Sequence, residues 1–488
     1  MRRAGVLAAV FSLPGRYGIG DFGQQAYRFV DMIAAAGAEI WQVLPLNPVG
    51  FGNSPYQSDS SFAGEPLYID PDALYHEGLL KERPAPLRAD ASYVSYEEVR
   101  AYKDRIFREA FASFRPDEEY RRFLEEEKWV TEYALFRVLQ ERNGGVEWFR
   151  WPEEEKALAG KAAEYKGEEE ERAYQCFLQY EFRRQWIRLR AYANKKGIRI
   201  LGDIPFYAGP NSLDTFLRQD EFLLDERGKP YLVAGVPPDY FSEDGQRWGN
   251  PVYDWAKMEE GGFAYWDERM TELSKLYDMI RVDHFRAFDS YWVIPEEEPT
   301  AIHGEWRYAP GYRFFDQLLP KIPGTEIVAE DLGLMRDEVY QLRDHYHFPG
   351  MKVLQFTYFD PWFKTRENMI CYTGTHDNDT VLGWYESLPA GQRRALKKSL
   401  GFSNAHGGFA AALIRKAMAE MCETVVIPVQ DILGLGSEAR INTPGTVGAH
   451  NWIWKLDSLE TLRKKIGKFS TMIEKNGRKH KAETSEEK

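Results

Sequence analysis

Residues 4–46 contain a strand, a helix and a second strand in close succession, AGVLAAV (4–10), DFGQQAYRFVDMIAAAG (21–37) and EIWQVLPL (39–46). The first and third segments are apolar at consecutive positions, as in parallel strands that are covered on both faces. In the middle segment the apolar residues between Ala26 and Ile33 recur at helical spacing, Asp21 is placed to cap the helix, and Gly37 to end it. The stretch is therefore predicted to form a βαβ unit.

Six further runs of strand length follow along the chain. Helical material separates them, so the eight strand candidates predict an α/β protein built on a (β/α)₈ TIM barrel. An open, doubly wound sheet is the alternative. The six runs are IRILGDIPF (198–206), MIRVDHF (279–285), EIVAEDL (326–332), KVLQFTY (352–358), MICYTGTHD (369–377) and VVIPVQDI (425–432).

The connections between these strands are uneven in length, which predicts insertions within one barrel rather than separate domains. We expect a single catalytic barrel over residues 1–475, with a mainly helical insertion over 60–195 after the second strand. A second insertion, also expected to be mainly helical, is predicted over 207–270, after the third strand. The polar residues 476–488 are predicted to form a C-terminal tail.

The composition excludes several classes of protein. With 63 basic and 76 acidic residues the formal net charge is −13, which argues against nucleic acid or an acidic membrane surface as a partner. No segment reaches the ~18–20 consecutive apolar residues of a membrane span. The cysteines, Cys176, Cys371 and Cys422, lie far apart without metal-ligand spacing, as in a reduced compartment. We therefore expect a soluble cytoplasmic protein, either a monomer or a weak homodimer.

Polar residues follow the apolar part of most of the predicted strands. In a TIM barrel the carboxyl ends of all strands meet at one rim, where the active site lies. Several acids gathered there repel one another and cost stability unless function requires them. The residues are Asp203, Asp283, Glu330, His376, Asp377, Gln430 and Asp431.

Two of these acids fit glycoside chemistry with retention of configuration, which needs a nucleophilic carboxylate and a carboxylic acid about 5–5.5 Å apart. Asp283 and Glu330 end consecutive strands, and adjacent strands lie ~4.8 Å apart. Arg281 projects from the same side of its strand as Asp283 and can keep that carboxylate ionised. Glu330 follows three apolar residues, which favours the raised pKa of a proton donor.

Two other classes of function use the same kinds of residue. His284, His376 and the aspartates could hold a catalytic metal ion, but no H-x-H or H-E-x-x-H pattern occurs and the neighbouring arginine disfavours a cation. A module that binds glucan without cleaving it would not need a pair of acids.

The chain resembles the 4-α-glucanotransferases, called amylomaltases or disproportionating enzymes, of glycoside hydrolase family 77 in the α-amylase clan. The resemblance extends from SLPGRYGIGDFG (12–23) to HNWIWKL (450–456). The blocks between them are LPLNPVGFGNSPYQSDSSFAG, LGDIPFY, VAGVPPDYFSEDGQRWGNPVY, RVDHFR, VAEDLG, FPGMKVLQF, YTGTHDND and PVQDILGLGSEARINTPG.

The resemblance implies a role for each matching residue. Asp283 would be the nucleophile that forms a covalent glycosyl-enzyme, Glu330 the general acid and base, and Asp377 the residue that binds the 2- and 3-hydroxyls of the distorted sugar. Tyr56 would stack on that sugar. The further substrate-binding residues would be Asp203, Arg281 and His376 around the acids, Tyr240, Phe241, Gln246 and Trp248 in a lid over the acceptor side, and Phe356 and Asn451.

The activity implied is the transfer of an α-1,4-glucan segment to the 4-hydroxyl of another glucan or of glucose. Its substrates would be malto-oligosaccharides, amylose or starch, and glycogen-derived glucans, and no cofactor or metal is implied. Because a lid that excludes water separates transfer from hydrolysis, the alternative is a hydrolase of the same clan.

Overall fold

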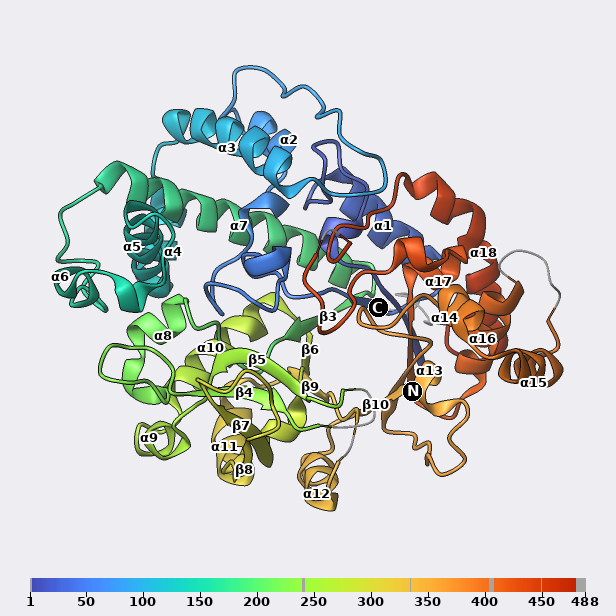
Figure 1. Ribbon diagram of the computed structural model, residues 1–488. Coiled ribbons are helices and arrows are strands. Elements are labelled where there is room, and N and C mark those ends of the chain that lie inside the picture. Colours follow the sequence, from blue (N-terminus) through green and yellow to red (C-terminus); the bar gives the residue numbers. More distant parts are fainter. Residues whose placement is uncertain (1, 239–241, 334, 403–407, 449, 480–488) are drawn as a thin grey trace, which may run out of the picture.

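Eight parallel strands form the central sheet of the computed structural model (Figure 1). The structure describes residues 2–238, 242–333, 335–402, 408–448 and 450–479. Along the sheet the strands follow the order β10-β11-β12-β1-β2-β3-β6-β9. Their bounds are β1 Arg3–Leu7, β2 Ile40–Gln42, β3 Arg199–Ile204, β6 Met279–Val282, β9 Glu326–Ala329, β10 Gly350–Val353, β11 Met369–Tyr372 and β12 Thr424–Pro428.

This order confirms the predicted barrel. Strands that follow one another in the chain lie side by side in the sheet, whereas a doubly wound sheet changes direction at a switch point. The two ends of the sheet, β9 and β10, come together where the backbone N–H of Ala329 donates to the carbonyl oxygen of Pro349 at 2.9 Å. The sheet is therefore a nearly closed barrel.

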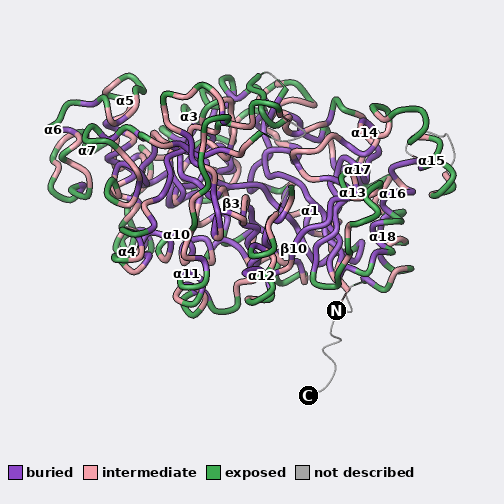
Figure 2. Tube along the Cα trace, turned by 60° about the horizontal axis from the view of Figure 1, so that its bottom comes forward, coloured by how far each residue is buried: buried purple, intermediate pink, exposed green. Residues whose placement is uncertain are grey.

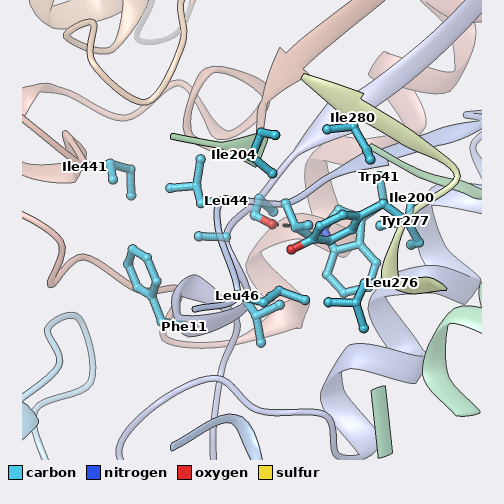
Figure 3. Close-up of a cluster of buried hydrophobic side chains, with 14 of the residues drawn as sticks. Phe11, Trp41, Leu44, Leu46, Ile200, Ile204, Leu276, Tyr277, Ile280 and Ile441 are labelled. Atoms are coloured by element: carbon cyan, nitrogen blue, oxygen red, sulfur yellow. Dashed lines mark hydrogen bonds between the residues drawn. The ribbon is translucent and has the colours of Figure 1, made fainter. Parts of the chain in front are cut away.

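Each of the eight barrel strands contributes to one buried cluster, which fills the barrel. Alternate residues point the other way and pack beneath the helices, as Trp41, Ile200 and Ile280 do (Figure 3). The buried parts of the chain run through the middle of the molecule, with exposed segments around them (Figure 2). The interior cluster consists of Leu7, Ile40, Leu201, Met279, Val328, Met351, Val353, Ile370, Tyr372 and Val426.

The long connection between β2 and β3 is mainly helical, as predicted for this part of the chain. Its last helix, α7 Glu169–Lys195, returns to the barrel and packs against α5 and α1. The other helices here are α2 Pro71–His76, α3 Tyr96–Ser113, α4 Glu118–Glu126, α5 Trp129–Arg142 and α6 Glu153–Lys156.

A second sheet, with strand order β5-β4-β7-β8, is antiparallel and lies beside the barrel (Figure 1). Two of its strands, β4 Leu232–Val236 and β5 Gln246–Pro251, lie in the predicted second insertion. The other two, β7 Ser290–Pro295 and β8 Glu305–Tyr308, come after barrel strand β6 and were not predicted. Helices α8 Leu213–Leu217, α9 Trp255–Glu260 and α10 Ala264–Leu276 complete this region.

Two predicted strands end early and continue as short helices. Strand β10 ends at Val353 and is followed by α13 Leu354–Thr357, and β12 is followed by α17 Val429–Leu433. Gln430 and Asp431 therefore lie in a helix and not at a strand end. The buried carboxylate of Asp431 accepts hydrogen bonds from Thr373 Oγ1 at 2.5 Å and from the N–H of Val381 at 2.9 Å. Asp431 thus lies at the carboxyl end of the barrel, as expected, but on a helix, and its oxygens hold the loop after β11.

The first helix begins later than predicted, with Gly23 rather than Asp21 as its N-cap. Asp21 is buried, where it accepts a hydrogen bond from the N–H of Gly23 and forms a 3.1 Å ion pair with Lys103. The remaining helices are α1 Gln24–Ala35, α11 Gly311–Leu318, α12 Asp337–His345, α14 Val381–Ser387, α15 Ala390–Leu400, α16 Gly408–Ala419 and α18 Leu459–Lys475.

Packed structure extends beyond α18, into the range expected to form a polar tail. Arg478 is fully buried, and its guanidinium donates to backbone carbonyls of Arg3, Met418, Glu420, Cys422 and Glu423. Within the described ranges no helix is both long and apolar enough to cross a membrane.

Candidate active site

Arg281 joins two carboxylates at the carboxyl ends of neighbouring strands. Strands β3 and β6 are paired with Asp203 opposite Arg281, so both side chains emerge at the same level of the barrel. The guanidinium lies 2.6 Å from Asp203 and 2.9 Å from Asp283. Asp203 and Arg281 are almost completely buried, while about a third (32%) of the Asp283 side chain remains accessible. Asp283 is thus the carboxylate of this pair that a ligand can reach.

The phenol of Tyr56 completes the hydrogen bonding of Asp203. Its hydroxyl donates to the second carboxylate oxygen at 2.9 Å. Burial, followed by the negative charge of Asp203, raises the pKa of Tyr56 well above its usual range, so the phenol stays protonated and remains a donor. Asp203 therefore holds Arg281 and Tyr56 in fixed positions behind Asp283.

Glu330 follows β9, the strand beside β6, as the sequence predicted. Its two carboxyl oxygens accept hydrogen bonds from backbone N–H groups of His284, at 2.8 Å, and Leu332, at 2.9 Å. Burial, with a further contribution from the charge of Asp283, raises the pKa of Glu330 to about 7. The carboxyl group is thus suited to hold a proton near neutral pH.

The pKa of Asp283 is also raised, mainly by burial, and the guanidinium of Arg281 opposes this rise. Asp203 and Asp377 add to it through their charges. Asp283 has a cation at 2.9 Å, whereas both hydrogen-bond donors to Glu330 are neutral N–H groups. When the two acids share one proton, that proton therefore resides on Glu330 and Asp283 carries the charge.

His284 has a left-handed backbone, with φ of 53°, which is uncommon for a residue with a side chain. This conformation directs the N–H of His284 at Glu330. The imidazole packs edge-on against Trp248, with ring centroids 4.8 Å apart. Burial and the charge of Arg286 lower the pKa of His284 to about 3, so the ring is neutral.

Asp377 lies in the loop after β11, held by residues that sequence reasoning missed. Asn442 Nδ2 donates to Asp377 Oδ1 at 2.7 Å, and Arg440 donates to the backbone carbonyl of Asp377 at the same distance. His376 Nε2 lies 3.4 Å from the other carboxylate oxygen. Both missed residues belong to the block PVQDILGLGSEARINTPG, which was the available signal.

Three rings connect Asp377 with the Asp203 side of the site. Tyr56 stacks on the imidazole of His376, with ring centroids 5.2 Å apart and planes at 18°. Trp452, which was not predicted, lies against both rings at 5.6 and 5.8 Å. The structure thus brings Tyr56, Arg281 and His376 together with the acids, as expected from the sequence.

The remaining predicted contacts lie in different surroundings. Gln246 and Trp248 are on β5, where Trp248 Nε1 donates to Gln246 Oε1 at 3.2 Å. Phe356 is on α13 and half exposed. Asn451 is buried, and its amide holds the segment 443–446 through the N–H of Thr443 and the carbonyl of Thr446. Tyr240 and Phe241 lie outside the described residues.

A separate cavity of about 550 Å³ lies between the helical insertion and α8 and α10. Its acids are largely paired within the protein, for example Glu127 with Lys275 and Glu268 with Arg218. No predicted site residue lines it. In the part of the chain that the structure describes, no group of three or more His, Cys, Asp or Glu side chains is placed to hold a metal ion.

Comparisons with known proteins agree with this arrangement. The family model for 4-alpha-glucanotransferases of glycoside hydrolase family 77 matches residues 8–461. The chain is 42% identical over 480 residues to a 4-alpha-glucanotransferase of Aquifex aeolicus, which covers 96% of this chain and 98% of the relative. It is 41% identical over 489 residues to the 4-alpha-glucanotransferase of Thermus thermophilus, and this match covers 93% of this chain and 95% of the relative.

A solved structure is similar over the same length. The amylomaltase from Streptococcus agalactiae in complex with acarbose has a TM-score of 0.93 at 34% identity, and the match covers 98% of this chain and 100% of that one. The match spans the barrel and both of its insertions. This chain is therefore an enzyme that belongs to the 4-alpha-glucanotransferases of glycoside hydrolase family 77.

Proposed function

We propose that this enzyme transfers α-1,4-glucan segments by a retaining double displacement, with Asp283 as nucleophile and Glu330 as general acid and base. The assignment of these two roles rests on one observation. Arg281 forms an ion pair with Asp283, whereas Glu330, at the end of the next strand, is buried among neutral donors and has a pKa of about 7. A pair of acids with opposite protonation states is what this reaction requires.

In the first step an oxygen of Asp283 attacks the anomeric carbon and the glucosidic C–O bond breaks. Glu330 gives its proton to the departing oxygen, and the fragment with the reducing end leaves. In the second step the Glu330 carboxylate takes a proton from the 4-hydroxyl of an acceptor. The acceptor oxygen attacks the anomeric carbon, the ester bond to Asp283 breaks, and both acids return to their first state.

The surrounding residues support this chemistry from fixed positions. Asp377, oriented by Asn442, would accept hydrogen bonds from the 2- and 3-hydroxyls of the reacting sugar. These hydrogen bonds would strengthen as the sugar ring flattens in the transition state. Tyr56 would stack on that sugar, since its ring is already held parallel to His376. Asp203 would act through Arg281 and keep the guanidinium beside the nucleophile.

On the acceptor side, Gln246 and Trp248 would form the part of the lid nearest Glu330, because Trp248 packs on His284. Tyr240 and Phe241 would belong to the same lid, and Phe356 would be a further substrate contact. Asn451 would act by holding the segment that follows Asn442. A lid that admits a sugar and excludes water favours transfer over hydrolysis, since both reactions share the glycosyl-enzyme.

The proposed donors are malto-oligosaccharides, amylose or starch, and glycogen-derived glucans, and glucose is a further acceptor. The name of the related enzymes and the acarbose bound by the Streptococcus agalactiae amylomaltase support this class of substrate. An α-amylase-clan hydrolase with the same pair of acids is the alternative.

The test is the distribution of products from maltotriose, resolved by chromatography. Wild-type enzyme should yield oligomers longer than maltotriose together with glucose or maltose. Asp283→Asn should yield none, while Asp220→Asn, which alters an exposed aspartate of the second insertion, should match wild type. Products no longer than the substrate would identify a hydrolase and refute the proposed lid.

A further inference from the structure

Two exposed aromatic side chains each lie against an arginine from a segment that follows a proposed catalytic acid. Trp306 and Tyr308 are on β8, with 38% and 67% of their surface exposed. The guanidinium carbon of Arg286 lies 4.2 Å from the ring centroid of Trp306, and that of Arg336 lies 5.1 Å from the ring centroid of Tyr308. These contacts hold both rings in position while leaving part of each exposed.

The two arginines come from the segments that follow the proposed catalytic acids. Arg286 is in the motif RVDHFR, three residues after Asp283, and Arg336 ends the loop that begins at Glu330. The two residues before Arg286 both donate backbone hydrogen bonds to Glu330, His284 to its carboxyl group at 2.8 Å and Phe285 to its backbone carbonyl at 3.2 Å. The Trp306 ring is thus linked through one side chain to the surroundings of Glu330.

The register of the second sheet places this pair beside the lid. Tyr308 is opposite Ser290, where β7 begins, and Trp306 is opposite Trp292, which in turn pairs with Gly235 of β4. Strand β4 ends one residue later, at Val236, where the connection to β5 that carries the proposed lid begins. The lid connection and the aromatic pair therefore occupy the same end of this sheet.

This arrangement matches the chemistry of a glucan chain. A glucose unit has flat apolar faces that pack on aromatic rings, and a rim of hydroxyl groups that accept hydrogen bonds from guanidinium groups. A general acid stands at the bond being broken, on the side of the departing fragment, and an acceptor later enters from that side. A chain that leaves the site past Glu330 and Arg286 would next meet Trp306 and Tyr308.

We propose that Trp306 and Tyr308 form a platform for the acceptor glucan, beyond the sugar unit that Glu330 contacts. The inference rests on the proposed function and extends it to the choice of acceptor. Long acceptors reach the platform, whereas a single glucose unit does not. The platform therefore favours transfer to longer chains.

The experiment compares acceptors of different length with amylose as donor. Methyl α-glucoside and methyl α-maltohexaoside serve as acceptors, and mass spectrometry measures the extended methyl glycosides. Tyr308→Ala and Trp306→Ala should lower kcat/KM for the maltohexaoside about three- to tenfold, the range expected for one aromatic contact. Both variants should use the glucoside as wild type does. Tyr231→Ala is the matched control, since Tyr231 is 48% exposed and precedes the opposite end of β4.

Two results would overturn the proposal. Equal losses with both acceptors would mean that the rings only fix Arg286 and Arg336, and unchanged kinetics with the maltohexaoside would mean that no glucan rests there. Should Trp306→Ala fail to fold in a melting experiment, Tyr308→Ala decides, because its ring is mostly exposed. A wild-type enzyme that transfers to neither acceptor would refute the proposed function itself, which keeps the two failures distinct.

Discussion

Asn442 Nδ2 donates a 2.7 Å hydrogen bond to Asp377 Oδ1, across 65 residues of sequence. The bond fixes one oxygen of the carboxylate and leaves the other beside His376. The backbone reinforces it, since the N–H of Asn442 donates to the carbonyl of His376 at 3.1 Å. Asn442 is therefore a positioning residue for the acid that is expected to hold the reacting sugar.

Replacing Asn442 should affect turnover more than binding. In Asn442→Ala the carboxylate loses its fixed orientation, so kcat for maltotriose disproportionation should fall about 10- to 100-fold, with KM changed less than threefold. Asn442→Asp should be worse, because a second carboxylate repels the first. Steady-state kinetics of both variants, with Asn143→Ala as control for a distant asparagine, test this. A rise in KM alone would argue against the positioning role.

The pH dependence of activity should follow Glu330. Its pKa of about 7 means that the proton needed by the departing oxygen is lost as the pH rises through neutrality. We expect kcat/KM to decline above about pH 7. The apparent pKa of this alkaline limb of the pH profile describes Asp283 and Glu330 together, because the two acids are coupled. In Glu330→Gln the residual activity should lack this limb. An unchanged alkaline limb in that variant would assign the ionisation to another group.

The stability of the protein should fall over the same pH range, for the same reason. The pKa of Glu330 rises from its ordinary value of 4.5 to about 7 on folding, so the stabilisation by its proton is complete below about pH 4.5 and is lost as the pH approaches and passes 7. At pH 8 the wild-type protein carries a buried charge that Glu330→Gln lacks. The variant should then be more stable by about 1–3 kcal/mol, with little difference at pH 4.5. Urea unfolding of both proteins at pH 8 and at pH 4.5 measures this difference in unfolding free energy.

Arg281 should be important for stability as well as for activity. Arg281→Met leaves Asp203 buried without its cation, which costs about 3–5 kcal/mol. Adding Asp203→Asn to the same protein should recover part of that loss, because the uncompensated charge is removed. Arg463→Met, which breaks an exposed pair with Glu460, should cost less than about 1 kcal/mol. Equal unfolding free energies for Arg281→Met and Arg463→Met would contradict this reading of the buried pair.

The end of the described chain should contribute measurably to stability. Arg478 donates five hydrogen bonds to backbone carbonyls at 2.8–3.2 Å, so Arg478→Ala leaves buried acceptors unpaired and should cost about 2–4 kcal/mol. Lys479→Ala alters a half-exposed neighbour and should change stability by less than about 0.5 kcal/mol. Thermal melts of the two variants should differ by several degrees.

Local sequence was sufficient for the parts of the fold that depend on local patterns. Runs of mostly apolar residues identified all eight barrel strands, because strands covered on both faces have few polar positions. The acids Asp203, Asp283 and Glu330 were found because they directly follow such runs. Strand ends were less certain, since Leu354–Thr357 and Val429–Leu433 are apolar but helical.

Features that depend on distant contacts were not predictable in this way. Strand β7 (SYWVIP) has the composition of a strand, but its partners, β4 and β8, are defined only by the antiparallel pairing of the second sheet. The contacts of Asn442 and Trp452 likewise join segments far apart in the chain. A single sequence contains no signal for such pairs except the motifs in which they lie.

The pairing of β1 with β12 has a consequence for synthesis in the cell. Strand β1 ends at Leu7 and its partner begins at Thr424, so one edge of the first strand has no neighbour until almost the whole chain has been made. At about 5–20 residues per second, translation between these points takes about 20–80 s. An apolar strand edge exposed for that time is a site for unwanted association. This edge of β1 therefore stays open to other chains until the ribosome delivers β12.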